Sequence, residues 1–168
     1  MIKYNREKAI EYANKWWDSC NPEFQKFKDD CTNYVSQCLQ AGGAPRTYGG
    51  EAEGWWYIRN GRNSDKWSFS WSVAHSLRWY LAKSNKGLTA TEVSSPNQLT
   101  FGDVICYDFD GDGRWQHTTI VSAINSSSLP LVNAHTINSK ERFWSYKDSD
   151  AWTPKIQYKF FHISDTFN

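Results

Sequence analysis

The sequence predicts an α+β fold in which N-terminal helices pack on a central antiparallel β-sheet. Apolar residues recur at helical spacing through the first half of the chain. The second half consists of short apolar runs that are separated by turn sequences rich in Gly, Asp, Asn and Ser. Helices followed by antiparallel strands is the α+β layout. Because 168 residues suit one domain with its own core, we expect residues 1–168 to form a single domain.

The helices are predicted by their apolar stripes. Residues 6–19 place five apolar side chains at helical spacing, namely Ala9, Ile10, Ala13, Trp16 and Trp17. A second helix begins at Cys31, because the residues at 31, 34, 35, 38 and 39 form one stripe, and the glycines at 42 and 43 end it. A third helix is expected over about 71–83. Residues 44–70 are expected to form a long irregular loop, and loops of that length are often functional.

The strands are predicted by short apolar runs between turns. Residues 101–109, FGDVICYDF, form one such run, and the DGDG that follows is strong hairpin-turn chemistry. Residues 117–124, HTTIVSAI, and 129–136, LPLVNAHT, form two more strands around an NSSS turn. Residues 155–163, KIQYKFFHI, form a further strand near the end of the chain.

The charge balance excludes several classes of protein. Lys and Arg number 19 against 18 Asp and Glu, so the net charge is +1 and no basic stripe indicates a nucleic-acid partner. No apolar run is long enough to span a bilayer, so we expect no membrane span. The N-terminal stretch MIKYNREKAIEYANKWW lacks the apolar region of a signal peptide. We expect a monomer.

The aromatic content is unusually high, at 17% of residues with ten Trp. Some of these rings must build the core. The remainder are candidates to line a surface groove, and the long loop offers Trp55, Trp56 and Trp67 for a substrate cleft. An aromatic-rich core is the alternative interpretation.

Cys31 is the candidate nucleophile because of its position at a predicted helix start. Asp30 is a good N-cap residue, which places Cys31 in the first helical turn. The helix dipole at that end favours a thiolate and lowers the thiol pKa, and the thiolate is the nucleophile. A free backbone N–H there can also hold an oxyanion. Alternatively, Cys31 lies on the apolar stripe and is a small core residue, as Cys38 is expected to be.

No disulfide framework is evident among the four cysteines. Cys31 and Cys38 lie two turns apart on one predicted helix, about 10 Å along its axis. That separation exceeds the reach of a disulfide. We therefore expect mostly reduced cysteines.

A cysteine nucleophile needs a base, and His117 is the candidate among four histidines. His117 opens a strand directly after the DGDG turn, where a side chain can project into a cleft. A hairpin centred near Ser126 places His135 opposite His117, in position to orient it. A small change of register favours Asn133 instead. The DGDG hairpin also brings Cys106 near His117, which makes Cys106 a competing nucleophile.

No metal site or cofactor is expected. The acidic residues Asp108, Asp110 and Asp112 match the first positions of a calcium loop, but position 12 is Thr119 and not the glutamate that such a loop needs. The glycines between them suit a hairpin turn, and calcium binding by this turn is left open. The spacing of the Cys and His residues does not match a zinc site.

Three segments together resemble the bacterial amidase domain family, which looks like a branch of the papain-like cysteine hydrolases that includes the NlpC-like and CHAP cell-wall enzymes. They are DCTNYVSQCLQAGG, GDVICYDFDGDGRWQHTTIV and VNAHTINSKERFWSY. The likeness covers nearly the whole chain and implies a papain-like fold with one catalytic domain. It implies the roles of nucleophile for Cys31, base for His117 and third polar residue for His135. Asp30 and Asn33 would support the helix start and the oxyanion.

This resemblance implies a cysteine amidase or peptidase that hydrolyses amide bonds in peptidoglycan or its peptide fragments. Such an enzyme acts at the bacterial cell wall, either secreted or delivered by a phage or host, as a lysin is. Two other classes stay open. One is a non-catalytic module that binds wall glycans, which the Trp excess favours. The other is an acyltransferase on the same scaffold, with an amine or alcohol as acceptor in place of water.

Overall fold

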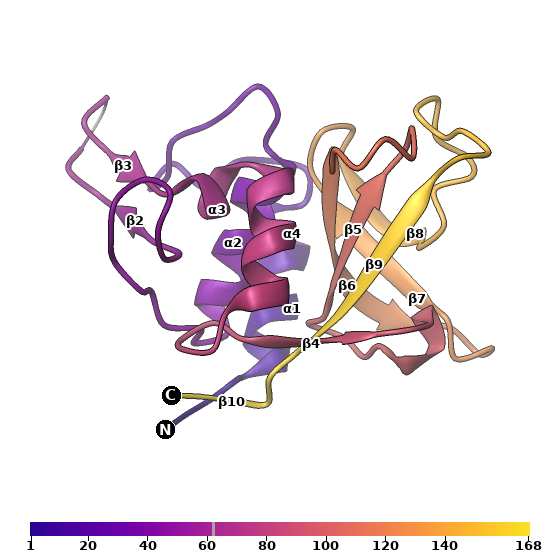
Figure 1. The fold of residues 1–168 in the computed structure, drawn as a ribbon, viewed down its shortest axis with the longest axis horizontal. Coiled ribbons are helices and arrows are strands. Elements are labelled where there is room, and N and C mark those ends of the chain that lie inside the picture. The colour runs from indigo at the N-terminus through magenta and orange to yellow at the C-terminus, as the bar shows by residue number, and fades with distance from the viewer. Residues whose placement is uncertain (62) are drawn as a thin grey trace.

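The computed structural model describes residues 1–61 and 63–168 and confirms the predicted α+β class. A helical layer is formed by α1 (Arg6–Trp16), α2 (Cys31–Ala41) and α4 (Ala74–Lys83), and it packs against one face of a six-stranded sheet (Figure 1). The segment between α2 and α4 lies on the far side of the helices and carries the small hairpin of β2 (Tyr57–Ile58) and β3 (Lys66–Trp67). The α2 helix lies between this segment and the sheet.

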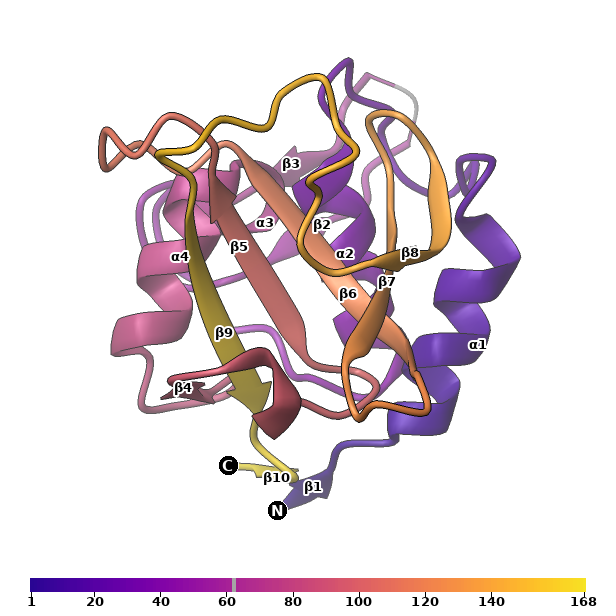
Figure 2. The same cartoon turned by 90° about the vertical axis from the view of Figure 1, so that its right-hand side faces the viewer.

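The six-stranded sheet has the order β4-β9-β5-β6-β7-β8, and every neighbouring pair is antiparallel. Its strands are β4 (Ala90–Val93), β5 (Val104–Asp108), β6 (His117–Ile124), β7 (Pro130–Ala134), β8 (Ser139–Phe143) and β9 (Gln157–Ile163). A separate two-stranded ribbon pairs β1 (Ile2–Lys3) with β10 (Thr166–Phe167) and brings the two ends of the described chain together (Figure 2). A 3-10 helix covers Pro96–Gln98.

The predicted helices are present, with two differences. The first helix ends at Trp16, three residues earlier than predicted. The third is divided into a short α3 (Phe69–Ser72) and α4, because Val73 between them adopts an extended conformation with φ −116° and ψ 123°. The side-chain oxygen of Asn5 caps α1 by accepting from the Lys8 N–H at 3.0 Å.

The four predicted strands are present as β5, β6, β7 and β9, whereas β4 and β8 were not predicted. Both of these are the edge strands of the sheet. β4 reads ATEV and β8 reads SKERF, so neither has a continuous apolar run. Edge strands commonly carry charged residues on their exposed side. These charges interrupt the short apolar runs from which strands are predicted.

Two apolar clusters fill the molecule, one on each face of the sheet. The larger lies between the helices and the sheet and contains residues of α2, α4, β5 and β6. The smaller lies on the outer face, where residues 144–156 cross in front of the strands (Figure 2). The Tyr107 hydroxyl donates to the Trp144 carbonyl at 2.8 Å, and the Tyr158 hydroxyl donates to the Ser145 carbonyl at 2.5 Å. These bonds attach the crossing segment to the sheet.

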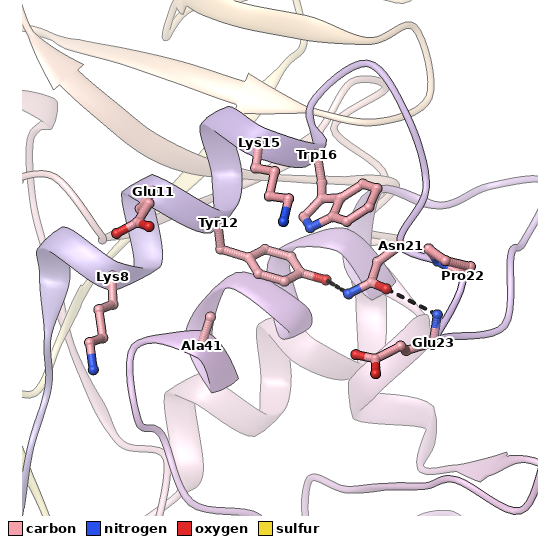
Figure 3. Close-up of a pocket in the computed structure, with 9 residues that line it drawn as sticks. All are labelled: Lys8, Glu11, Tyr12, Lys15, Trp16, Asn21, Pro22, Glu23 and Ala41. Atoms are coloured by element: carbon pink, nitrogen blue, oxygen red, sulfur yellow. Dashed lines mark hydrogen bonds between the residues drawn. The ribbon is translucent and has the colours of Figure 1, made fainter.

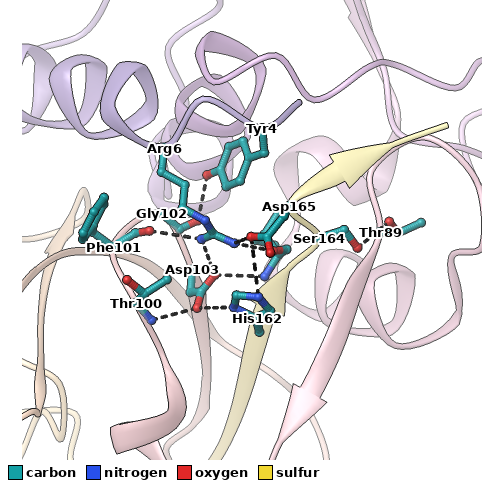
Figure 4. Close-up of polar contacts among 11 residues, drawn as sticks. Tyr4, Arg6, Thr89, Thr100, Phe101, Gly102, Asp103, His162, Ser164 and Asp165 are labelled. Carbon is teal, nitrogen blue, oxygen red and sulfur yellow. Dashed lines mark hydrogen bonds and ion pairs between the residues drawn. The ribbon is translucent and has the colours of Figure 1, made fainter. Parts of the chain in front are cut away.

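A buried carboxylate, Asp103, joins the first helix to the last strand (Figure 4). Its oxygens accept from Arg6 Nη1 at 2.7 Å, from His162 Nδ1 at 2.9 Å and from the Ile163 N–H at 2.9 Å. Arg6 Nη2 donates to the Ile163 carbonyl at 2.5 Å and also reaches Asp165. The network therefore fixes the N-terminal part of α1 on the end of β9.

We expect Asp103→Asn to destabilise the protein by about 2 kcal/mol, because it leaves the Arg6 guanidinium without its buried partner. For a domain of this size that corresponds to a fall in Tm of about 5 °C. Asp165→Asn is the matched control, because the Asp165 side chain is 76% exposed and its ion pair with Arg6 contributes little. Thermal unfolding of the two variants checks this, and equal shifts would contradict it.

No helix within the described residues is long and apolar enough to cross a membrane.

Candidate active site

Cys31 is the first residue of α2, as the sequence predicts, and it is 5% exposed. The start of α2 lies against the start of β6, because Thr32 Oγ1 lies 3.0 Å from Thr118 Oγ1. Cys31 and His117 immediately precede these two threonines. The structure therefore brings the two candidate residues to the same end of the helix and sheet layers.

The position of Cys31 is fixed by the carboxylate of Asp30. Asp30 Oδ1 accepts from the Phe27 N–H at 3.1 Å and from Asn33 Nδ2 at 2.9 Å. Asp30 Oδ2 lies 2.6 Å from His135 Nδ1, and the Asp30 N–H donates to Thr136 Oγ1 at 3.0 Å. Two segments that lie far apart in the sequence, residues 27–33 and 135–136, thus meet at the residue before the nucleophile candidate.

The roles predicted for Asp30 and Asn33 are corrected by these contacts. Asp30 occupies the N-cap position, but its side chain makes no capping bond to the backbone of α2. The Asn33 amide donates to the Gln25 carbonyl and to Asp30, and its oxygen accepts from Trp71 Nε1 at 2.9 Å. Because these bonds occupy the Asn33 side chain, it braces the helix start and has no donor directed at an oxyanion.

His117 lies at the start of β6 among aromatic rings of the outer cluster. Its Nε2 is 3.0 Å from the Tyr146 hydroxyl, and its ring centroid lies 5.5 Å from Tyr107 and 6.0 Å from Phe109. Thr118 contacts α2, so alternation along the strand directs His117 to the opposite face. Within residues 1–61 and 63–168, Cys31 Sγ has its side-chain contact with Thr32 Oγ1 at 3.7 Å and none with His117.

The predicted register between the strands of residues 117–124 and 129–136 is wrong by one residue. Ile120 pairs with Asn133, so the continuation of the ladder places Thr136 opposite His117 and His135 opposite Thr118. A shift of one residue moves a side chain to the other face of the sheet. His135 therefore faces α2 and does not orient His117.

The two alternatives considered with that register are also corrected. Asn133 is fully buried, where its Oδ1 accepts from Ser122 Oγ at 2.7 Å and its Nδ2 donates to Asn14 Oδ1 at 3.0 Å. In the other hairpin Tyr107 pairs with His117, and Cys106 pairs with Thr118. Cys106 thus lies in the helix-facing core and not beside the His117 ring.

His135 forms a buried ion pair. Its Nδ1 faces the Asp30 carboxylate at 2.6 Å, and its Nε2 faces the Trp16 carbonyl at 2.5 Å. Both partners are oxygen atoms within hydrogen-bond distance, so both ring nitrogens are engaged. The ring also stacks on Tyr34 with centroids 4.1 Å apart. His135 therefore connects the end of α1 to the start of α2.

Electrostatics keep both candidate groups neutral at rest. Burial raises the pKa of the Cys31 thiol, although the Thr32 hydroxyl and the nearby backbone N–H groups of Thr118 and Thr32 lower it in part. The expected thiolate at the helix start is therefore not the resting form. Burial, assisted by the Arg142 guanidinium, lowers the pKa of His117 to about 3.

We expect the His117 ring to remain neutral from neutral pH down to about pH 3. Its pKa in the folded state lies below the ordinary value of about 6.5, so the unfolded chain takes up the proton first. The contribution of His117 to stability is therefore complete above about pH 6.5 and decreases as the pH falls toward 3. An NMR titration of the ring checks this, and Arg142→Gln should raise the midpoint. A wild-type midpoint near 6.5 would contradict the prediction.

The His117 pocket is a cavity of about 440 Å³ lined by the His117 ring. Its other lining residues are Phe109, Asp110, Gln116, Thr136, Ile137, Arg142, Tyr146, Ser149 and Ala151. Arg142 lies over the Tyr146 ring at 4.0 Å and is held by Asp148 at 3.2 Å. Arg142 and Tyr146 were not predicted from the sequence. Arg142 lies in the unpredicted edge strand β8, and Tyr146 lies in the crossing segment that follows it.

A strained turn forms one wall of the His117 pocket. Thr136 and Ile137 have φ of 59° and 61°, a conformation that β-branched residues rarely adopt. Thr136 also accepts from the Asp30 N–H, so the turn is attached to the start of α2. Strain of this kind persists where surrounding contacts fix it, and it is common beside functional sites.

The three tryptophans predicted to line a cleft divide into two groups. Trp55 is fully buried in the main core, where its Nε1 donates to Ser36 Oγ at 3.0 Å, so the prediction is wrong for this residue. Trp56 and Trp67 line one pocket of about 430 Å³ with residues 49–51, 65, 66 and 69. That pocket and the His117 pocket share no lining residue.

The acidic residues considered for metal binding are used in other ways. Asp108 accepts from the N–H groups of Gly111 and Gly113, at 3.0 and 2.7 Å, as a hairpin turn requires. Within the described residues, the atoms of Cys20, Asp30 and His135 that could ligate a metal ion lie within 4.8 Å of one another. Both nitrogens of His135 already lie within hydrogen-bond distance of an oxygen, one at Asp30 and one at the Trp16 carbonyl. The closeness of Asp30 and His135 in this group is therefore accounted for by their ion pair.

The fold and the site define an α+β domain with a cysteine at the start of a helix and a histidine at the start of the strand against which that helix start packs. The chain belongs to the family described as "Putative amidase domain", whose profile matches residues 3–161. This confirms the amidase family that the sequence resembles, and the family description indicates an amidase-type hydrolase. The papain-like relationship stays a prediction.

Two curated proteins of Bacillus subtilis (strain 168) are similar to the chain. "Uncharacterized protein YhbB" is 52% identical over 165 residues, which is 98% of this chain and 51% of that protein. "Uncharacterized protein YjcM" is 29% identical over 143 residues, 80% of this chain and 31% of that protein. The chain thus spans about half the length of the first and about a third of the second. No solved structure matches it.

Proposed function

We propose that this domain is a cysteine-dependent hydrolase of amide bonds, with Cys31 as nucleophile and His117 as base. The observation that carries the proposal is the contact between Thr32 and Thr118, which brings the start of α2 to the start of β6. Family membership supports the reaction class. Catalytic hydrogen bonds are often incomplete in a free enzyme and tighten when substrate binds.

The chemistry proceeds by acyl transfer to water. His117 takes the proton of the Cys31 thiol, and the sulfur attacks the amide carbonyl carbon. The tetrahedral intermediate collapses to a thioester as His117 returns the proton to the leaving amine. Water then attacks the thioester and releases the carboxylic acid and the free thiol. The Cys31 N–H at the helix start is placed to hold the oxyanion.

Tyr146 replaces His135 in the proposed role of orienting the base. A base that accepts the thiol proton through Nδ1 carries its resting proton on Nε2, and Nε2 faces the Tyr146 hydroxyl at 3.0 Å. Burial raises the pKa of Tyr146 to about 12, with Arg142 lowering it and Cys31 among the groups that raise it.

We expect Tyr146→Phe to lower kcat about tenfold while KM and Tm change little, because a misdirected imidazole still reaches the productive orientation part of the time. The pH profile of kcat is the second readout, since the loss of the hydroxyl changes the environment of His117. Tyr158→Phe is the control, because its hydroxyl bonds the same crossing segment at the Ser145 carbonyl without touching His117. Equal losses in both variants would show a purely structural role.

We propose peptidoglycan or its peptide fragments as the substrate, with the domain acting as a monomer at the bacterial cell wall. The sequence resemblance supports this assignment. A cationic residue, Arg142, in the His117 pocket suits the free carboxylates of such peptides.

Mass spectrometry of fragments from a panel of purified peptidoglycans tests the proposal, with Cys31→Ala as the blank. New amine and carboxyl ends in equal number support hydrolysis and identify the bond. Transfer to an added amine acceptor indicates the acyltransferase alternative. The absence of any Cys31-dependent fragment across the panel contradicts the proposal.

A further inference from the structure

A second pocket, which we call the Trp79 pocket, lies on the outer side of α3 and α4 and encloses about 480 Å³. It is lined by Ala52, Gly54, Phe69, Ser70, His75, Ser76, Trp79, Tyr80, Lys83 and Ser84. None of these residues lines the His117 pocket. The mechanism proposed above assigns it no role.

Two aromatic rings are exposed at this pocket. Phe69 is 45% exposed and Trp79 is 41% exposed. Tyr80 adds a third ring, whose hydroxyl lies 3.0 Å from Thr47 Oγ1. Flat, exposed rings beside hydroxyl groups suit the apolar face of a pyranose ring, which pockets of this size accommodate.

The pocket is positively charged and has no acidic lining residue. Lys83 Nζ lies 5.3 Å from the Trp79 ring centroid, and Arg78 Cζ lies 3.8 Å from the same centroid. Neither cation forms an ion pair with a carboxylate of residues 1–61 or 63–168. The Glu51 carboxylate lines the neighbouring pocket of Trp56 and Trp67, which shares Phe69 with the Trp79 pocket.

Arg78 stacks on Trp79 and does not itself line the pocket, but its buried guanidinium adds positive charge behind the Trp79 ring. It is 6% exposed, and its Nε and Nη1 have no hydrogen-bond partner among the described residues. Its guanidinium lies between Trp79 and Trp115, whose ring centroid is 5.1 Å away. Indole rings offset only part of the cost of burying a cation. A carboxylate in the adjacent pocket would offset more of it.

His75 lines this pocket and also contacts the chain segment that leads into His117. Its Nδ1 accepts from the Trp115 N–H at 3.2 Å, so its ring proton is on Nε2. Trp115 is two residues before His117 in the chain. A ligand in the Trp79 pocket would therefore lie across the β5–β6 turn from the His117 pocket.

We propose that the Trp79 pocket binds a sugar that carries a carboxylate. Phe69 and Trp79 pack on the pyranose ring, Lys83 attracts the carboxylate, and His75 Nε2 donates to an oxygen of the ligand. The Arg78 guanidinium, which stacks on the Trp79 ring, adds to the positive potential without contacting the ligand. The site binds without reacting, so it does not depend on Cys31 chemistry. If the proposed hydrolase activity is also correct, this site anchors the glycan while the attached peptide reaches His117.

The test is binding of N-acetylmuramic acid and of N-acetylglucosamine to the full chain carrying Cys31→Ala. The two probes share the pyranose and differ in the lactyl carboxylate. We expect N-acetylmuramic acid to bind about tenfold more tightly, to shift the Trp79 indole signal in NMR, and to lose this preference as salt is raised. Equal affinity for the two sugars, or no binding, would overturn the proposal.

Lys83→Ala is the diagnostic variant, because the Lys83 side chain is exposed and its loss should leave the fold intact. Trp79→Ala tests the stacking ring, and its Tm is measured alongside because Trp79 also stacks on the buried Arg78. Lys15→Ala is the matched control: Lys15 Nζ also lies 5.3 Å from an indole, that of Trp16, in a pocket that contains Glu11 and Glu23 (Figure 3). We expect Lys83→Ala to remove the preference for the acidic sugar and Lys15→Ala to keep it. Loss in both, or in neither, would show that the Trp79 pocket is not the site. Failure of hydrolysis does not affect this measurement.

Discussion

Cys31→Ala is expected to abolish hydrolysis and to leave the fold intact. Cys31 is the residue proposed to form the thioester, so its removal takes away the whole covalent route. Loss of a nucleophile costs at least about 10³-fold in kcat/KM. The side chain is small and lies at the rim of the core, so the loss of packing is about 1 kcal/mol. Activity is measured on the fragment or amide substrate, and Tm on the same sample.

Two other cysteines provide the controls for this experiment. Cys20→Ala removes a half-buried thiol near the Asp30 carboxylate, and we expect it to keep activity. Cys106→Ala removes a fully buried core thiol whose pKa is raised by burial, so we expect lower stability and retained activity. If Cys31→Ala retained more than about a tenth of wild-type turnover, the nucleophile assignment would be wrong, and a loss in Cys20→Ala or Cys106→Ala instead would identify the residue responsible.

Thiol labelling separates an enzyme from a binding module only if the resting state is considered. Burial raises the pKa of Cys31, so slow alkylation by iodoacetamide in mild acid does not identify a binding module. The helix dipole lowers the pKa of a thiol at an exposed helix start, as the sequence predicts for Cys31. At 5% exposure the Cys31 sulfur is poorly solvated, and this burial raises its pKa instead. Labelling in the presence of substrate fragments is the more informative comparison.

Local patterns predicted the helices and central strands correctly, because the spacing of apolar residues within one element shows which of its faces is buried. The helix of residues 31–41 and the first residue of β6 are where the sequence places them. Register between strands is a different matter, since it depends on where a bulge falls. The pairing of β6 with β7 shifts between Val121 and Ala123, and no residue of the NSSS turn indicates this.

The missed site residues have a common cause. Tyr146 and Arg142 reach His117 only because a charged edge strand forms and the chain then crosses back over the outer face. That crossing is a tertiary arrangement with no periodic signal. Trp55 shows the converse: a Trp in a glycine-rich loop looks exposed, yet the loop folds over α2 and buries it completely. Composition alone could not distinguish the rings of the core from those of the surface.

His135→Gln is expected to destabilise the domain strongly, since the structure makes this residue a brace of the nucleophile and not a partner of the base. The substitution leaves the Asp30 carboxylate buried without its counterion and removes a donor to the Trp16 carbonyl. Removing one partner of a buried ion pair costs about 3–5 kcal/mol. For a domain of this size the fall in Tm is on the order of 10 °C.

A double-mutant cycle identifies the partner of His135. In the double variant Asp30→Asn with His135→Gln, two neutral amides can hydrogen-bond, so we expect its loss of stability to be smaller than the sum of the single losses. Tyr34→Leu is the control for ring stacking, since it removes the 4.1 Å contact with His135 and leaves the ion pair in place. Additive losses for the Asp30 and His135 changes would show that the pair is not coupled.

The activity of His135→Gln decides between a brace and a third catalytic residue. If His135 acts by positioning Asp30, activity per folded molecule falls only as far as Cys31 is displaced, and the pH profile of kcat keeps its wild-type form. A residue that orients the base would instead change that profile, as Tyr146→Phe is expected to do. Measurements well below the Tm of the variant exclude unfolding as the cause. A His135→Gln variant with wild-type Tm and a shifted pH profile of kcat would contradict the bracing role. His135 would then be the third catalytic residue that the resemblance implies, and its ion pair with Asp30 would be absent from the active form of the enzyme.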